Sequence, residues 1–151
     1  MKYKIYSLLL FVVLLFPLSM SAQKLEWNLD VNGFFDNSEG DHHFRPTKTM
    51  DGVRLSPEMG LSWDNGKNAI YGGYTGLAEW GTKKAFSDGD AIVYYKYDWK
   101  PLRFILGSFS RDNLLGEYPS YLISDSIRYY RPNIQGFTFQ YQTDKGYIEM
   151  F

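Results

Sequence analysis

Ionisable side chains at alternating positions are the main chemical feature of the sequence. Glu26 and Asp30 alternate with apolar residues in one segment, and Arg54 and Glu58 do so in a second. Two carboxyl groups such as those of Asp30 and Glu58 can act as a general acid and a general base. Carboxylates on the polar face of a strand are, however, typical of the lining of a water-filled barrel. We therefore expect these residues to line a wall and predict no catalytic role for them.

A second candidate is the cluster Asp41, His42 and His43, which contains both histidines of the chain. Imidazole and carboxylate groups are common metal ligands, but adjacent residues of an exposed loop rarely converge on one ion. The sequence also lacks a glycine-rich phosphate loop, a nucleophile elbow and a metalloprotease helix motif. These observations predict no enzyme activity, no catalytic residues, no metal site and no cofactor.

The elements that carry the charged residues are predicted to be long strands with one apolar face. The stretch GVRLSPEMGLSW at 52–63 alternates strictly, because every second residue from Val53 is apolar or proline. Such alternation indicates a β-strand, since successive side chains point to opposite faces. Pro57 lies in the middle of this strand, where we expect a β-bulge. Further strands are predicted at 25–35, 70–80, 91–99, 102–111, 137–141 and 146–151.

The connections between these strands alternate between long and short. The short ones are DNGK, DWKP and TDKG, of which the first contains the pair Asn65-Gly66, typical of a hairpin turn. The long ones fall near 37–49, 81–90 and 112–133. In an up-and-down meander this pattern places all short turns at one end, as in outer-membrane barrels. The sequence therefore predicts an all-β, antiparallel up-and-down transmembrane β-barrel.

Large aromatic residues are expected near both ends of the strands, where membrane interfaces select them. The expected belt residues are Trp27, Trp63 and Trp99 at one end and Phe35 and Trp80 at the other. An exported soluble β-sandwich that binds glycans is the alternative, but its strands are usually shorter and it does not explain the one-sided loop lengths. We count about seven strands, whereas single-chain barrels have an even number of at least eight. We therefore expect the chain to be an incomplete N-terminal segment of a barrel.

The N-terminus predicts export. Lys2 and Lys4 precede an apolar run that ends in small residues, which is typical of a signal peptide cut after Ala22. The predicted domains are thus a signal peptide at 1–22 and an outer-membrane barrel segment at 23–151. The chain has no cysteine and a net charge of −1, which excludes a disulfide framework and argues against a nucleic-acid partner.

The segments WNLDVNGFFDN, RLSPEMGLSW and GSFSRDNLLGEYPSYLISDSIRYYRPNIQGFTFQY resemble porin-like outer-membrane β-barrel proteins of Gram-negative bacteria. The resemblance covers essentially the whole mature chain. It implies an outer-membrane location and passive passage of small hydrophilic solutes. The implied partners are the lipid bilayer, the outer-membrane assembly machinery and the solutes, with oligomerisation left open.

On this interpretation the polar faces line a pore, and the aromatic connection at 112–133 narrows or caps it. Arg111, Arg128 and Arg131 are expected to face acidic residues across the constriction, and the tyrosines to offer a stacking surface. The expected pore-lining residues are Glu26, Asp30, Arg54, Glu58, Lys96, Asp98, Arg103 and Arg111. The expected constriction residues are Glu117, Tyr118, Tyr121, Asp125, Arg128, Tyr129, Tyr130 and Arg131.

Overall fold

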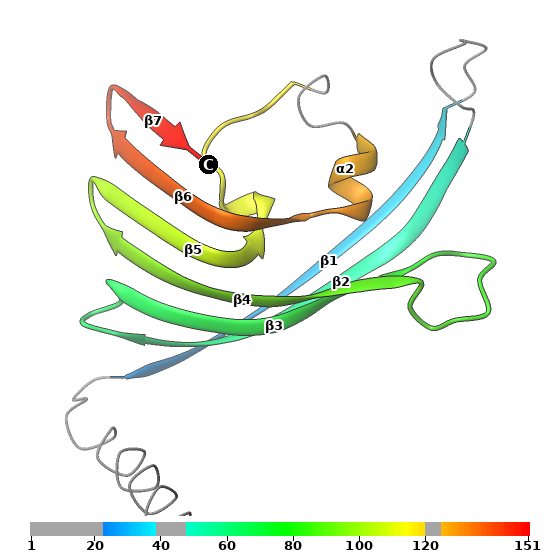
Figure 1. The fold of residues 1–151 in the computed structure, drawn as a ribbon, viewed down its shortest axis with the longest axis horizontal. Helices are drawn as coiled ribbons and strands as arrows, with labels where there is room; N and C mark the ends of the chain where they lie inside the picture. The colour runs from blue at the N-terminus through cyan, green and yellow to red at the C-terminus, as the bar shows by residue number, and fades with distance from the viewer. Residues whose placement is uncertain (1–22, 39–47, 120–124) are drawn as a thin grey trace, which may run out of the picture.

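The part of the chain that the structure describes forms one antiparallel sheet of seven strands in the order β1-β2-β3-β4-β5-β6-β7. The computed structural model describes residues 23–38, 48–119 and 125–151. The sheet curls into part of a barrel (Figure 1). Its strands are β1 (Lys24–Ser38), β2 (Lys48–Trp63), β3 (Asn68–Ala78), β4 (Asp88–Trp99), β5 (Leu102–Ser110), β6 (Asn133–Thr143) and β7 (Gly146–Met150). Between β5 and β6 lie the 3-10 turn η2 (Arg111–Asn113) and the short helix α2 (Asp125–Tyr130).

The turns β2–β3, β4–β5 and β6–β7 lie at one end of the sheet, and the β3–β4 connection lies at the other, together with the end of β1 and the start of β2 (Figure 1). In the first turn Asn65 and Gly66 have φ values of 56° and 82°, as predicted for this pair. The predicted all-β meander and its connection pattern are therefore confirmed. Among the described residues, no helix is long and apolar enough to cross a membrane.

The two faces of the sheet differ sharply in exposure. Convex-face residues are large and apolar yet exposed, for example Trp27 (78% exposed), Leu29 (54%) and Met59 (60%). The concave face curls around α2 (Figure 1) and buries polar side chains, including Arg54 and Glu58. A single sheet with an uncovered apolar face rules out the β-sandwich alternative for the described residues, because no second sheet packs against it.

The hydrophobic clusters lie on the concave side. The first consists of Ala69, Tyr71, Ile92, Tyr94, Ile105 and Phe109. In the second, Phe34, Met50 and Leu77 pack against Tyr129 and Tyr130. These clusters fix the curvature of the sheet and hold the β5–β6 connection in place.

The expected bulge at Pro57 is not formed. Leu55 pairs with Gly76 and Glu58 pairs with Gly73, so the register on both sides of Pro57 is the same and no extra residue is inserted. The ladder to β3 is instead interrupted for two residues. There the Ser56 and Thr75 hydroxyl groups, 2.8 Å apart, hydrogen bond across the strands. A side-chain bond thus replaces the ladder bond that proline cannot donate.

Candidate functional site

The connection between β5 and β6 packs into the concave side of the sheet. The Tyr129 ring stacks on Phe34 with centroids 4.2 Å apart, and the Tyr130 hydroxyl donates to the Glu79 carboxylate at 3.0 Å. The guanidinium of Arg54 donates two hydrogen bonds to the Tyr129 carbonyl, at 3.0 and 2.7 Å. These contacts attach α2 to strands β1, β2 and β3.

The other end of the connection is attached to β7 through one carboxylate. Glu149 accepts from the backbone amides of Leu115 (2.9 Å) and Gly116 (3.3 Å) and from the Tyr118 hydroxyl (2.5 Å). Partial burial and this carboxylate raise the pKa of Tyr118 to about 12, so the phenol stays a donor at neutral pH. The Gln140 amide donates to the same carboxylate at 2.6 Å and to the Asn113 carbonyl at 2.7 Å.

A pocket of about 340 Å³ lies between the connection and strands β1 and β2. Its size is within the range of small-ligand sites. Polar and aromatic residues line it: Asp30, Asn32, Phe34, Arg54, Ser56, Ser110, Arg111, Asp112, Glu117, Tyr118, Arg128, Tyr129 and Asn133 are among them. The long strands supply one wall of the pocket, and the connection supplies the other.

Two arginines of this pocket, Arg54 and Arg111, donate to neutral acceptors among the described residues. Besides the Tyr129 carbonyl, Arg54 contacts the Thr75 hydroxyl at 3.3 Å, although only 4% of Arg54 is exposed. Arg111 donates to the Arg131 carbonyl at 3.0 Å, and burial lowers its pKa below the usual value. Arg128, which is exposed, makes no hydrogen bond to any described residue. All of these side chains remain charged at neutral pH, because an arginine pKa is far above 7.

Acidic residues gather towards one side of the pocket. A second pocket of about 180 Å³ adjoins it, because Asp30, Ser56, Ser110 and Asp112 line both. Glu58 lines only the second pocket and accepts from the Tyr94 hydroxyl at 3.0 Å. No group of three His, Cys, Asp or Glu side chains among the described residues is arranged to hold a metal ion.

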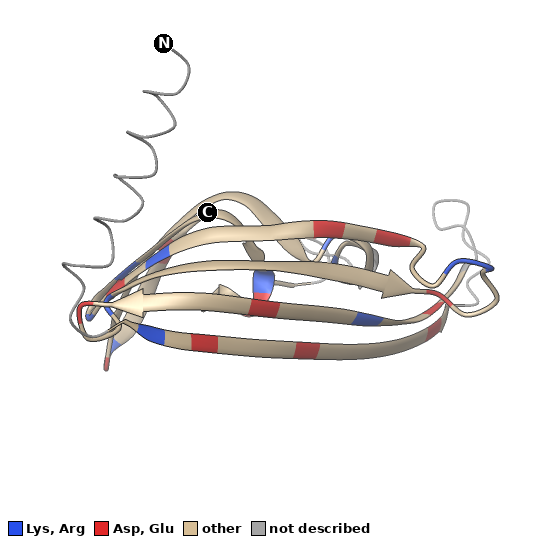
Figure 2. Cartoon of the chain, turned by 90° about the horizontal axis from the view of Figure 1, so that it is seen from below, with Lys and Arg blue, Asp and Glu red and all other residues tan. Residues whose placement is uncertain are grey.

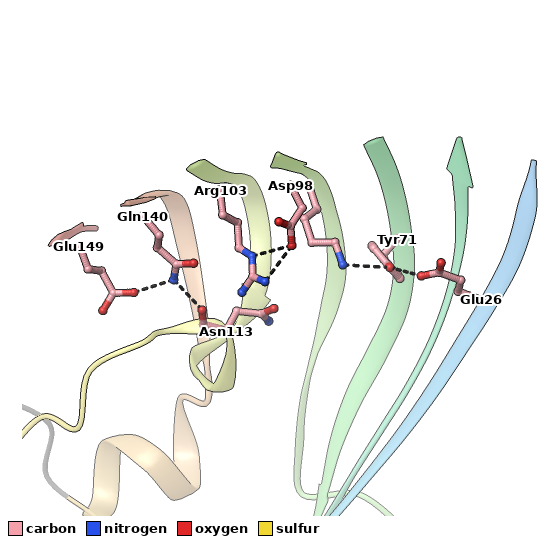
Figure 3. A network of polar contacts seen from close by, with 8 residues as sticks. Glu26, Tyr71, Asp98, Arg103, Asn113, Gln140 and Glu149 are labelled. Atoms are coloured by element: carbon pink, nitrogen blue, oxygen red, sulfur yellow. Dashed lines mark hydrogen bonds and ion pairs between the residues drawn. The ribbon is translucent and has the colours of Figure 1, made fainter. Parts of the chain in front are cut away.

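The remaining polar residues of the concave face form a network near the short turns (Figure 3). The Tyr71 hydroxyl donates to Glu26 at 2.5 Å, and Lys96 donates to Tyr71 at 3.3 Å. Arg103 and Asp98 form an ion pair at 2.8 Å. Along the strands acidic and basic positions are interspersed (Figure 2). Among these described residues Arg103 and Asp98 form an ion pair, whereas Lys96 and Glu26 are linked only through the Tyr71 hydroxyl.

The structure distributes the predicted pore-lining residues over two parts of the concave side. Glu26, Lys96, Asp98 and Arg103 belong to the network near the short turns. The other four, which are Asp30, Arg54, Glu58 and Arg111, line the two adjoining pockets.

The predicted constriction residues are only partly brought together. Glu117, Tyr118, Arg128 and Tyr129 line the larger pocket, whereas Tyr130 packs beside it on Phe34 and the Arg131 side chain is exposed. The predicted pairs across a constriction are not formed among the described residues. Tyr121 and the Asp125 side chain lie outside the described part of the chain, as do Asp41, His42 and His43.

The predicted belt aromatics lie at the ends of strands or beside them. Four of them are well exposed: Trp27 (78%), Phe35 (67%), Trp80 (62%) and Trp99 (56%). Trp63, beside the first short turn, is half-buried and packs near Tyr95 at 6.3 Å between ring centroids. Their contact with a membrane interface stays a prediction.

Sequence reasoning missed several residues that build the site. Ile92 and Tyr94 look like exceptions to the alternation of their strand, yet both are buried on the concave face. Glu149 looks misplaced among apolar residues, yet it ties β7 to the connection. In each case the residue type interrupts the alternation of apolar and polar residues along the strand. Such an interruption can indicate a side chain that is buried on the concave face and contacts other residues there.

Comparison with known families decides the assignment. A family model described as Lipid A 3'-O-deacylase-type matches residues 18–151, which include every described residue. The chain belongs to this family. A search of curated proteins found no match, and neither did a search of solved structures.

This family membership corrects three predictions. The porin-like assignment is wrong, because the matching family is a lipid A deacylase type. The predicted passive channel and the prediction of no enzyme activity are wrong for the same reason, since a deacylase is a hydrolase. The three errors share one cause: a barrel-like strand pattern does not imply a pore, because fold does not imply function. The all-β fold is compatible with the outer-membrane location expected of a lipid A-modifying protein.

Proposed function

We propose that this chain forms the wall of an outer-membrane β-barrel that hydrolyses an ester-linked acyl chain of lipid A. The observation that carries the proposal is the contrast between the faces of the sheet. Strands β1 to β6 span 9 to 16 residues, and a tilted strand needs about 9 to 11 to cross a bilayer. Their convex face is apolar and exposed, which suits lipid, whereas their concave face buries polar side chains beside two apolar clusters.

Ester hydrolysis requires an activated water and a group that stabilises the negative oxygen of the intermediate. Water adds to the ester carbonyl carbon, the bond to the sugar oxygen breaks, and a fatty acid and a sugar hydroxyl result. Histidine is the usual base at neutral pH, because its pKa lies near 6.5. The only histidines, His42 and His43, belong to the connection between β1 and β2, and these two strands also line the pocket. The proposed base is one of this pair.

The test uses the full chain expressed in a Gram-negative host that lacks lipid A deacylase activity. Mass spectrometry of extracted lipid A is expected to show loss of one acyl chain and the matching fatty acid in the medium. The double variant His42→Gln/His43→Gln is expected to lower this rate by about 100-fold or more, the range of general base catalysis. Arg45→Gln in the same connection is the control and keeps the rate.

Two results separate the parts of this proposal. Unchanged lipid A in the presence of heat-modifiable, membrane-inserted protein would overturn the deacylase function itself. Full activity of the double histidine variant would leave the function standing and remove the histidine assignment.

A further inference from the structure

The arginines of the pocket form no ion pair with a described carboxylate, although Asp88 and Asp90 act on Arg54 electrostatically from a greater distance. Among the described residues the only ion pair joins Arg103 to Asp98. No described carboxylate oxygen therefore lies within 4.0 Å of the Arg54, Arg111 or Arg128 guanidinium. Arg54 is almost fully buried, and a buried charge is costly unless an opposite charge and hydrogen bonds compensate it. The tyrosine carbonyl and the threonine hydroxyl that contact Arg54 supply hydrogen bonds without charge.

The acidic residues of the pocket are separated from these arginines. Asp30 and Asp112 lie at the boundary with the smaller pocket, and Glu58 lies beyond it. The three arginines line the larger pocket and do not line the smaller one. Glu117 also lines the larger pocket, but it is exposed and pairs with none of them. The cavity thus has a basic end next to α2 and an acidic end next to β4.

An unsatisfied donor lies in the same wall. Asn133 lines the larger pocket, and its side-chain amide nitrogen is buried without a hydrogen-bond partner. Such groups are rare in folded proteins, because burying a donor without an acceptor is energetically unfavourable. An acceptor supplied by a ligand would satisfy it.

We infer that the basic end of this pocket binds a phosphate group. A guanidinium donates parallel hydrogen bonds to phosphate oxygens, and the amide of Asn133 supplies a neutral donor. The cavity of about 340 Å³ is large enough for a phosphorylated sugar ring. This inference rests on the proposed function, because it makes the phosphate of a glycolipid the group that orients the acyl ester. Free phosphate has the same chemistry, and the experiment distinguishes the two sources.

Binding is measured on the full chain in detergent micelles by isothermal titration calorimetry. The probes are inorganic phosphate, bisphosphorylated lipid A, and the same lipid A after enzymatic removal of its phosphates. Arg111→Gln/Arg128→Gln is expected to weaken binding of the phosphorylated lipid by about tenfold or more, given the strength of charged hydrogen bonds. Arg131→Gln is the matched control, since it removes the same charge from the same connection outside the pocket. It is expected to change binding less than about twofold.

The single variant Arg128→Gln is not expected to disturb folding, because Arg128 is exposed and makes no hydrogen bond to a described residue. Phosphorylated lipid that binds more tightly than dephosphorylated lipid, with the arginine dependence, identifies the glycolipid as the source. Inorganic phosphate that binds as tightly as the lipid identifies free phosphate. Equal binding by the double variant and wild type, or equal loss in Arg131→Gln, overturns the inference. Arginine-dependent phosphate binding without fatty acid release keeps the inference and overturns the proposed function.

Discussion

Strands β1 and β2 present opposite kinds of surface from neighbouring residues. On the outer face Leu29 and Met59 are 54% and 60% exposed and have no side chains packed over them. On the inner face Ser56 and Glu58 are 7% and 6% exposed, and each has a hydrogen-bond partner. These two inner-face side chains thus have partners within the protein, whereas the two outer-face side chains are left uncovered. This difference between adjacent residues is the strongest argument for a membrane location.

An added charge is expected to reduce stability much more on the outer face than on the inner face. Leu29→Arg is expected to destabilise the protein in lipid vesicles by about 2–4 kcal/mol, the cost of arginine on a lipid-facing strand. Asn28→Arg places the same residue one position earlier, in the pocket that Glu58 lines, and should cost little. Unfolding by guanidinium chloride, followed by tryptophan fluorescence, measures both. Similar stabilities of the two variants would contradict the assignment of the faces.

Removing one tyrosine hydroxyl tests how much the hydrogen bonds of the inner face contribute to the stability of the protein. The Tyr94 hydroxyl donates to the buried Glu58 carboxylate, while the Tyr95 hydroxyl donates to Asn68 at the strand end, at 2.6 Å. Tyr94→Phe is expected to cost about 1.5–3 kcal/mol, because it deprives a buried carboxylate of its donor. Tyr95→Phe should cost about 1 kcal/mol or less. The same unfolding assay compares the two variants. Equal losses of stability would show that the hydrogen bond between Tyr94 and Glu58 contributes no more than the one between Tyr95 and Asn68.

Two adjacent glycines, Gly72 and Gly73, allow the packing on the two faces of the sheet to be compared. A Cβ atom at Gly73 would lie 2.3 Å from the Pro57 carbonyl oxygen, whereas one at Gly72 would meet nothing within 4 Å. Gly73→Ala is therefore expected to destabilise the protein by about 1–3 kcal/mol. Gly72→Ala should stay within about 0.5 kcal/mol of wild type. A tolerated alanine at Gly73 would mean that β2 and β3 separate easily at the interrupted ladder.

Much of the fold was predictable because strand periodicity is local. The alternation in 52–63 and the Asn65-Gly66 turn each depend on a few neighbouring residues. The position of the β5–β6 connection was not predictable, because its attachments to Phe34, Arg54 and Glu149 join residues far apart in the sequence. A carboxylate that accepts from backbone amides leaves no motif in a sequence. The site could therefore be predicted only as a set of polar residues, without its pocket.

The chemistry was less predictable than the fold. Alternating charges are common to channels and to barrel enzymes, since both enclose a polar interior. The histidine pair lies outside any metal-ligand pattern, and a single histidine that acts as a base has no spacing signature in a sequence. A strand pattern describes the wall of a barrel and contains little information about the reaction that takes place beside it.

The carboxylate of Glu149 makes the pocket dependent on the last of the seven strands. Residues 115, 116 and 118 form part of one pocket wall or its support, and all three are bound by this side chain. Strand β7 pairs only with β6 among the described strands. The pocket wall therefore depends on a strand that is itself held along a single edge of the sheet.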